Sequence, residues 1–176
     1  MSMLDLKTRI LNFTPGNSNV LDVGAGMGFY HCDLLAKTPN LTLLDAHQPY
    51  LDERLKKFPQ VLTINRQALG YLQDTLFYYD VILGIDFLEH LDKPEAMDVV
   101  YYMRHRADRV ALFVPEGVHP QDRDAYGMGD DHWQTHRSTW YAGDMEALGF
   151  TVEVLPSFHG HLPGKDPGAL WCEWRK

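Results

Sequence analysis

The chain has 176 residues and a formal net charge of −8, with 45% hydrophobic and 23% charged residues. This length fits a single domain spanning residues 1–176, and the composition is that of an ordinary globular protein. Binding to the phosphates of nucleic acid needs clustered Lys and Arg, and this acidic sequence has no long basic run. We therefore expect no nucleic acid as a partner.

The two cysteines, Cys32 and Cys172, lie too far apart in sequence for a disulfide framework or a zinc knuckle. The first residues lack the apolar segment of a signal peptide, and no apolar run approaches the length of a transmembrane helix. We expect a cytoplasmic protein without membrane contact. The sequence indicates no particular oligomeric state.

The first nineteen residues contain an amphipathic stretch with Leu4, Ile10 and Leu11 on its apolar face. Val20–Val23 then has the composition of a buried parallel strand, and glycines follow at positions 24, 26 and 28. A helical pattern of apolar residues begins at Met27. A strand, a glycine turn and a helix form the first half of a nucleotide-binding unit.

The spacing of the glycines favours some nucleotides over others. A dinucleotide fingerprint has the order G-x-G-x-x-G, whereas Gly24, Gly26 and Gly28 give G-x-G-x-G, and position 29 is Phe29. Asp22 precedes the turn, and its carboxylate would repel a pyrophosphate but would suit an amino group. The turn therefore disfavours a dinucleotide.

The segment Asp22–Gly28 resembles the first motif of class I S-adenosylmethionine-dependent methyltransferases. The resemblance implies an α/β fold, a three-layer α/β/α Rossmann-like sandwich around a seven-stranded, mostly parallel sheet of order 3-2-1-4-5-7-6 with an antiparallel last strand. It also implies S-adenosylmethionine as the cofactor, with its amino-acid end beside the glycines and its amino group near Asp22. An ordinary glycine turn between a strand and a helix is the alternative.

A second strand is predicted at Leu41–Leu44, and Asp45 closes it. A carboxylate about 20 residues after the glycine turn can accept hydrogen bonds from both ribose hydroxyls. The alternative role for Asp45 is the N-cap of the next helix, which is expected to begin near residues 47–50. In the family this loop flanks the adenosine, which implies contacts from Ala46 and His47.

The third strand is predicted at Val61–Ile64. In the family, the turn that follows often carries an acidic residue that contacts the adenine amino group. This sequence has no acidic residue in that turn, but Gln67, next to Ala68, can accept a hydrogen bond through its amide oxygen. A short helix is expected over residues 69–77.

The fourth strand, Val81–Ile85, is almost entirely apolar, and Asp86, Glu89 and His90 follow it. Ligands of doubly wound sheets lie outside the carboxyl ends of the strands, near the point where strand order reverses. The D-x-x-E-H run resembles the fourth motif of the family. The backbone from Gly84 to Asp86 is expected to offer carbonyl acceptors to the cofactor.

The second half of the chain continues the β/α alternation. Asp92 and Glu95 form a predicted capping box for a helix to about residue 107, and a strand follows at 109–114. Residues 115–137 lack periodicity but contain several aromatic and histidine side chains, which is typical of a loop that covers a substrate. A helix is expected from 138–140 to 148–150, before a terminal hairpin of strands 151–155 and 169–174.

The resemblance implies transfer of a methyl group from the sulfonium of the cofactor to an acceptor. The protein must align donor and acceptor, and it can remove a proton from the acceptor. Candidate bases are His90, His119, His132 and His136, because imidazole titrates near neutral pH. The alternative is that His90 only packs beneath the fourth strand and that the loop histidines face solvent.

The loop also contains residues that could form a metal site. His132 and His136 lie four residues apart, with Asp130 and Asp131 beside them. Zinc sites need three or four converging ligands, and the neighbouring glycines disfavour the helix that would align these two histidines. We therefore expect no metal.

The sequence thus predicts a methyltransferase that acts on a small-molecule acceptor. The alternative is a non-catalytic domain of the same fold that binds the cofactor or a protein partner. The expected catalytic residues are His90, His132 and His136. The expected cofactor-binding residues are Asp22, Gly24, Ala25, Gly26, Gly28, Asp45, Ala46, His47, Gln67, Ala68, Gly84, Ile85 and Asp86.

Overall fold

The computed structural model describes residues 3–124, 126–128, 131–156, 158 and 168–176. Seven strands form one sheet in the order β3-β2-β1-β4-β5-β7-β6, which confirms the predicted order. The strands are β1 (Val20–Val23), β2 (Leu41–Asp45), β3 (Leu62–Asn65), β4 (Tyr79–Ile85), β5 (Ala107–Pro115), β6 (Thr151–Leu155) and β7 (Ala169–Arg175). β7 is antiparallel to both of its neighbours, and the pairs from β3 to β5 are parallel.

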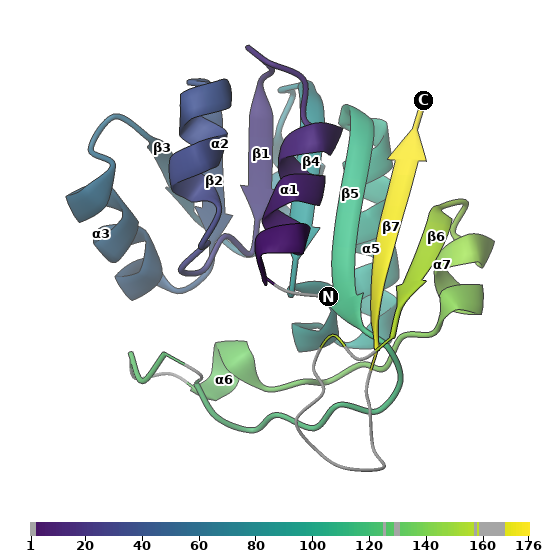
Figure 1. Ribbon diagram of the computed structural model, residues 1–176. Coiled ribbons are helices and arrows are strands. Elements are labelled where there is room, and N and C mark those ends of the chain that lie inside the picture. Colours follow the sequence, from purple (N-terminus) through teal and green to yellow (C-terminus); the bar gives the residue numbers. More distant parts are fainter. Residues whose placement is uncertain (1–2, 125, 129–130, 157, 159–167) are drawn as a thin grey trace.

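Helices cover both faces of this sheet (Figure 1). They are α1 (Met3–Phe13), α2 (His31–Lys37), α3 (Gln48–Lys57), α4 (Ala68–Asp74), α5 (Lys93–His105), α6 (Asp131–Gln134) and α7 (Ala142–Ala147), with a 3-10 turn η1 (Leu88–His90). The apolar side chains of α1, α2 and α3 pack on one face, and those of α4, α5 and α7 pack on the other. The predicted three-layer sandwich is therefore confirmed.

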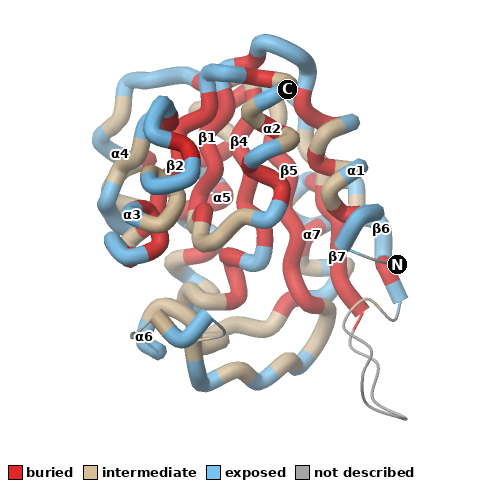
Figure 2. The backbone as a smooth tube through the Cα atoms, turned by 60° about the vertical axis from the view of Figure 1, so that its left-hand side comes forward, coloured by how far each residue is buried: buried red, intermediate tan, exposed pale blue. Residues whose placement is uncertain are grey.

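The most buried part of the sheet is its centre. β1 is buried at all four positions, and β4 and β5 are buried over most of their length, because helices cover both of their faces. β3, at one edge, is exposed or intermediate throughout. Figure 2 shows the strands as a buried layer and the segment around α6 as intermediate or exposed. This segment passes beyond the carboxyl ends of the parallel strands (Figure 1).

The predicted helix after the glycine turn begins later than expected. α2 starts at His31 rather than at Met27, because the chain first forms two tight turns. The N–H of Gly28 donates to the carbonyl of Ala25, and that of His31 donates to the carbonyl of Gly28, each at 3.2 Å. The apolar periodicity from Met27 therefore belongs partly to a turn.

Three further expectations about the helices were wrong. Leu4 is 64% exposed, whereas Ile10 is buried as expected, and Leu6 and Phe13 complete the buried face of α1. The Asp92 side chain makes no capping hydrogen bond, so the predicted capping box of α5 does not form. Trp140 does not begin a helix, because its carbonyl accepts from Gly117 at 2.8 Å in an isolated β-bridge.

The predicted terminal hairpin is confirmed by the pairing of β6 with β7. Most of its connecting loop lies outside the described residues. Among the described residues, no helix combines the length and the apolar character needed to cross a membrane.

Candidate functional site

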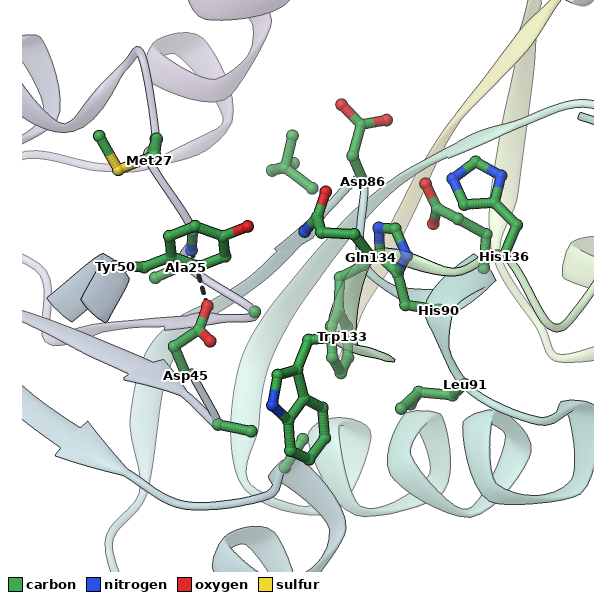
Figure 3. Close-up of a pocket in the computed structure, with 18 of the residues that line it drawn as sticks. Ala25, Met27, Asp45, Tyr50, Asp86, His90, Leu91, Trp133, Gln134 and His136 are labelled. Atoms are coloured by element: carbon green, nitrogen blue, oxygen red, sulfur yellow. Dashed lines mark hydrogen bonds between the residues drawn. The ribbon is translucent and has the colours of Figure 1, made fainter. Parts of the chain in front are cut away.

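A cavity of about 440 Å³ lies at the carboxyl ends of the central strands. Its walls come from the glycine turn after β1, from the ends of β2 and β4, and from the segment that contains α6. In Figure 3, Asp45 and Tyr50 lie on one side of the cavity, and His90 and His136 lie on the other. This volume is within the usual range for small-molecule sites, about 300–1,000 Å³. The position matches the ligand crevice of doubly wound sheets.

The glycine turn contains left-handed backbone conformations that other residue types adopt only at an energetic cost. Gly24 and Gly26 have φ values of +66° and +47°. A Cβ atom on Gly24 would lie 2.2 Å from the ring of Phe87. Ala25 and Gly28 belong to the same turn, and all four residues lie on the cavity wall. The glycines therefore let the chain turn sharply under the cavity while Phe87 packs beneath it.

Asp45 holds the glycine turn to the end of β2. One carboxylate oxygen accepts the N–H of Gly26 and the other accepts the N–H of His47, both at 2.8 Å. Burial raises the pKa of Asp45, and these two hydrogen bonds oppose that change. The carboxylate lies on the cavity wall with a fixed orientation. It can therefore accept hydrogen bonds from a diol without rearranging.

Asp22 does not lie on the cavity wall, contrary to expectation. It is fully buried, and one carboxylate oxygen accepts a hydrogen bond from the hydroxyl of Tyr30 at 2.8 Å and lies 2.7 Å from Nε2 of His31. The three side chains form a buried polar cluster below the glycine turn. In this structure Asp22 therefore braces the turn from below and is not part of the cavity wall.

Two other expected cofactor contacts also lie outside the cavity wall. His47 is 8% exposed and its ring packs on Tyr50, with the ring centroids 4.6 Å apart. Gly84 lies within β4, where a Cβ atom would approach Leu112 to 2.9 Å. Its position is explained by close packing between β4 and β5.

The other expected cofactor residues do line the cavity. These are Ala46, Gln67, Ala68, Ile85 and Asp86. Asp86 has a φ of +49°, an uncommon conformation for a non-glycine residue. It turns the chain at the end of β4, and its side chain points into the cavity (Figure 3).

The wall opposite Asp45 is formed by η1 and by the segment after α6. Glu89, His90 and His136 meet there, and the rings of His90 and His136 have centroids 4.9 Å apart. Burial, and secondarily the charge of Asp86, raises the pKa of Glu89 well above its usual range. Burial lowers the pKa of His90 to about 4 and also lowers the pKa of His136. Burial therefore favours the neutral form of both imidazoles.

The remaining histidine candidates also line this cavity. The backbone carbonyl of His119 lies 2.5 Å from Nδ1 of His136. His132 is exposed, and both its carbonyl and its ring lie near the guanidinium of Arg137. Arg137 also donates to the carbonyl of His90 at 2.5 Å. These contacts connect residues 115–137, the covering segment, to η1.

Sequence reasoning missed several residues of the wall. Tyr50, from α3, donates a hydrogen bond to Asp124 at 2.8 Å, and its ring lies 5.6 Å from that of Tyr126. The sequence pattern also gives no sign of the role of Arg137, and it places Glu89 in the D-x-x-E-H run without indicating its function. The aromatic content of residues 115–137 was the available signal, but it did not identify which rings face the cavity.

No protein-family model and no curated protein matches this sequence. Solved structures do match its fold. N-methyltransferase NodS from Bradyrhizobium japonicum WM9, in complex with S-adenosyl-L-homocysteine, is 16% identical with a TM-score of 0.69, covering 98% of this chain and 86% of that chain. A second match is the 1,6-didemethyltoxoflavin-N1-methyltransferase of Burkholderia thailandensis, with bound 1,6-didemethyltoxoflavin and S-adenosylhomocysteine. It is 17% identical with a TM-score of 0.67, covering 98% and 75% of the two chains.

A proposed Zn-dependent alcohol dehydrogenase from Rhodobacter sphaeroides matches as well, at 14% identity and a TM-score of 0.70, covering 97% of this chain and 88% of that chain. Identities this low establish the fold alone. The chain therefore has the class I methyltransferase fold, with the strand order and the antiparallel β7 of that fold.

Proposed function

We propose that this protein is an S-adenosylmethionine-dependent methyltransferase with a small-molecule acceptor. The observation that carries the proposal is Asp45, which is buried, fixed by two backbone N–H groups and directed at the cavity beside the glycine turn. A carboxylate held in this way suits the ribose of a nucleoside. Structural neighbours with methyltransferase activity support the same ligand class.

The residues present fit the proposed cofactor. The turn at Gly24–Gly28 is open to the cavity and allows close approach of a ligand to the backbone. Ala46, Gln67 and Ala68 lie on the wall near Asp45, where small side chains and one amide could receive an adenine ring. When bound, the cofactor supplies an activated methyl group on a positively charged sulfur.

The protein's own part is to align the acceptor and to exclude water from the cavity. His90 and His136 hold neutral rings at the opposite wall, and neutral imidazoles can accept a proton. His136 is the better candidate of the two, because a base with a pKa of about 4 is weak at neutral pH. The exposed ring of His132 is the weaker candidate for this role.

A small acceptor is favoured by the enclosed form of the site. The segment around α6 covers the cavity, and hydrogen bonds from Arg137 and Ser138 to the carbonyl of Glu89, at 2.7 and 3.1 Å, fasten this segment to η1. A large folded substrate would have to displace these contacts. One neighbour in the comparison carries the small heterocycle 1,6-didemethyltoxoflavin.

Thermal unfolding with and without ligand tests the proposal. S-adenosylhomocysteine at about 100 times its Kd should stabilise the fold by about 2.7 kcal/mol, which for a chain of this size is a rise in Tm of about 5–10 °C. NAD should give no rise. Absence of a shift with 1 mM S-adenosylhomocysteine would overturn the proposal. Binding without a methylated product from any acceptor in a broad screen would favour the non-catalytic alternative.

A further inference from the structure

Glu89, His90 and His136 form a compact set of potential metal ligands. One carboxylate oxygen and one ring nitrogen from each histidine all lie within 4.8 Å of one another. Glu89 and His90 come from η1, whereas His136 comes from the covering segment, which hydrogen bonds hold against η1. The fold therefore brings together three donors from two distant parts of the sequence.

Two side-chain atoms of Glu89 and His90 are buried without a hydrogen-bond partner among the described residues. They are Oε2 of Glu89, whose residue is 2% exposed, and Nδ1 of His90. A buried polar atom without a hydrogen-bond partner destabilises the fold, because it has lost its hydration. A bound cation would satisfy both atoms at once.

The third donor is already oriented. Nδ1 of His136 lies 2.5 Å from the carbonyl of His119, and a carbonyl can only accept, so this nitrogen carries the ring proton. The lone pair of His136 is then on Nε2. A ligating histidine usually donates its other N–H to a carbonyl or carboxylate in this way, which fixes its orientation.

We propose that Glu89, His90 and His136 bind one divalent transition-metal ion. Two imidazoles and one carboxylate, with further positions open to water or substrate, are a donor set used for Zn²⁺ and other first-row metals. Mg²⁺ and Ca²⁺ prefer oxygen ligands and are disfavoured. Bonds of about 2.0–2.2 Å would draw the donors closer than 4.8 Å, which small side-chain rotations can supply.

This site differs from the metal site that the spacing of His132 and His136 suggests. Among the described residues 131–136, only His136 belongs to the cluster, and Asp130 lies outside the described residues. His132 is exposed, with its ring beside the guanidinium of Arg137. The other two ligands come from η1, about 45 residues earlier in the chain, and not from the neighbours of His136 in sequence.

The ion would lie in the same cavity as Asp45, on the opposite wall. When bound, it would polarise an acceptor oxygen as a Lewis acid. That role rests on the proposed function, but the binding itself does not. In such a complex the His136 lone pair is used by the ion and is not available as a base.

Titration of tag-free protein, stripped with chelator and dialysed, tests the site without any cofactor. Co²⁺ is followed by its visible absorption and Zn²⁺ by calorimetry. We expect one ion per chain, with affinity reduced at least about tenfold in Glu89→Gln and in His136→Ala. His105→Ala is the matched control, because this exposed histidine lies outside the cluster, and Cys32→Ser excludes binding by the exposed thiol.

Unchanged Zn²⁺ and Co²⁺ affinity in both ligand variants, or no binding at one ion per chain, would overturn the proposal. Glu89→Gln preserves the shape of the buried carboxyl, so we expect this variant to fold even if His136→Ala does not. Circular dichroism checks the folding of both variants. Calorimetry with S-adenosylhomocysteine in metal-free buffer tests the proposed function separately. Either proposal can therefore fail alone.

Discussion

Replacing Asp45 with alanine should separate the turn-holding role of this carboxylate from its proposed role in ribose binding. The substitution removes the acceptors of two backbone N–H groups, those of Gly26 and His47, each at 2.8 Å. Hydrogen bonds to a charged group are worth about 1.5–3 kcal/mol each. Part of this lost stability is offset, because Asp45→Ala also removes a buried carboxylate, whose pKa is raised by burial. We expect a net loss of about 1–3 kcal/mol in the free energy of unfolding.

The expected effect on ligand binding is larger. If the Asp45 carboxylate accepts both ribose hydroxyls, alanine loses two charge-assisted hydrogen bonds, or about 3–6 kcal/mol. The Kd of S-adenosylhomocysteine should then rise by about 10² to 10⁴-fold. Isothermal titration at a temperature where the variant is fully folded measures this change, and urea unfolding measures the stability.

Asp80→Ala provides a matched control for Asp45→Ala. Its carboxylate also accepts a backbone N–H, that of Asn19 at 2.7 Å, but it lies at the other end of β4 and away from the cavity. This control should lower stability and leave the Kd unchanged. A folded Asp45→Ala protein whose Kd is within about threefold of the wild type would refute the ribose assignment.

Three further predictions concern the turn and the ion pair at α7. Asp22→Asn should lower the free energy of unfolding by about 1–3 kcal/mol, because it disturbs the buried hydrogen bond to His31, and should leave the Kd of S-adenosylhomocysteine unchanged. Gly28→Ala should cost about 1–3 kcal/mol in urea unfolding, because the new Cβ atom would lie 2.1 Å from the ring of His31. The hydrogen bond from Lys93 lowers the pKa of Asp144, so the stabilisation is present above the unfolded pKa and is lost as pH falls through the folded value. The side chains of Lys93 and Asp144 are both about one-third exposed. The free energy of unfolding of the wild type should therefore exceed that of Asp144→Asn by at most about 1 kcal/mol at pH 6, and by less at pH 3.

Each of these predictions has a control or a contrary outcome. If the Kd of S-adenosylhomocysteine is tenfold higher for folded Asp22→Asn than for the wild type, the predicted contact between Asp22 and the cofactor is supported. Gly143→Ala, in α7, has no atom within 4 Å of the new Cβ and should not destabilise the fold. If the free energies of unfolding of the wild type and Asp144→Asn differ by the same amount at pH 6 and pH 3, the ion pair does not contribute to stability.

The strand pattern of this protein could be predicted because it depends on local composition. β1 and β4 are short apolar runs that end in polar residues, and parallel strands buried on both faces need such runs. The glycine turn and Asp45 were likewise located correctly relative to the strands. Helix starts were less predictable, because turns such as Gly24–Tyr30 continue an apolar periodicity without helical hydrogen bonds.

The direction of a side chain at a strand end was decided only by tertiary structure. Asp22 and Asp45 both lie at the carboxyl ends of neighbouring strands, yet Asp22 is held below the turn by Tyr30 and His31, whereas Asp45 faces the cavity. Periodicity reports which residues are buried. It does not show which buried side chain forms a hydrogen bond with a given carboxylate.

By itself, the sequence determined the α/β alternation, the glycine turn and the polar run after β4, because each is a local pattern. Only the tertiary structure decided that His136 meets Glu89 and His90. That meeting depends on how the segment after β5 folds back over the carboxyl ends of the strands and is fastened to η1 by backbone hydrogen bonds. Contacts between segments so far apart in sequence leave no periodicity, since they depend on the path of an irregular chain.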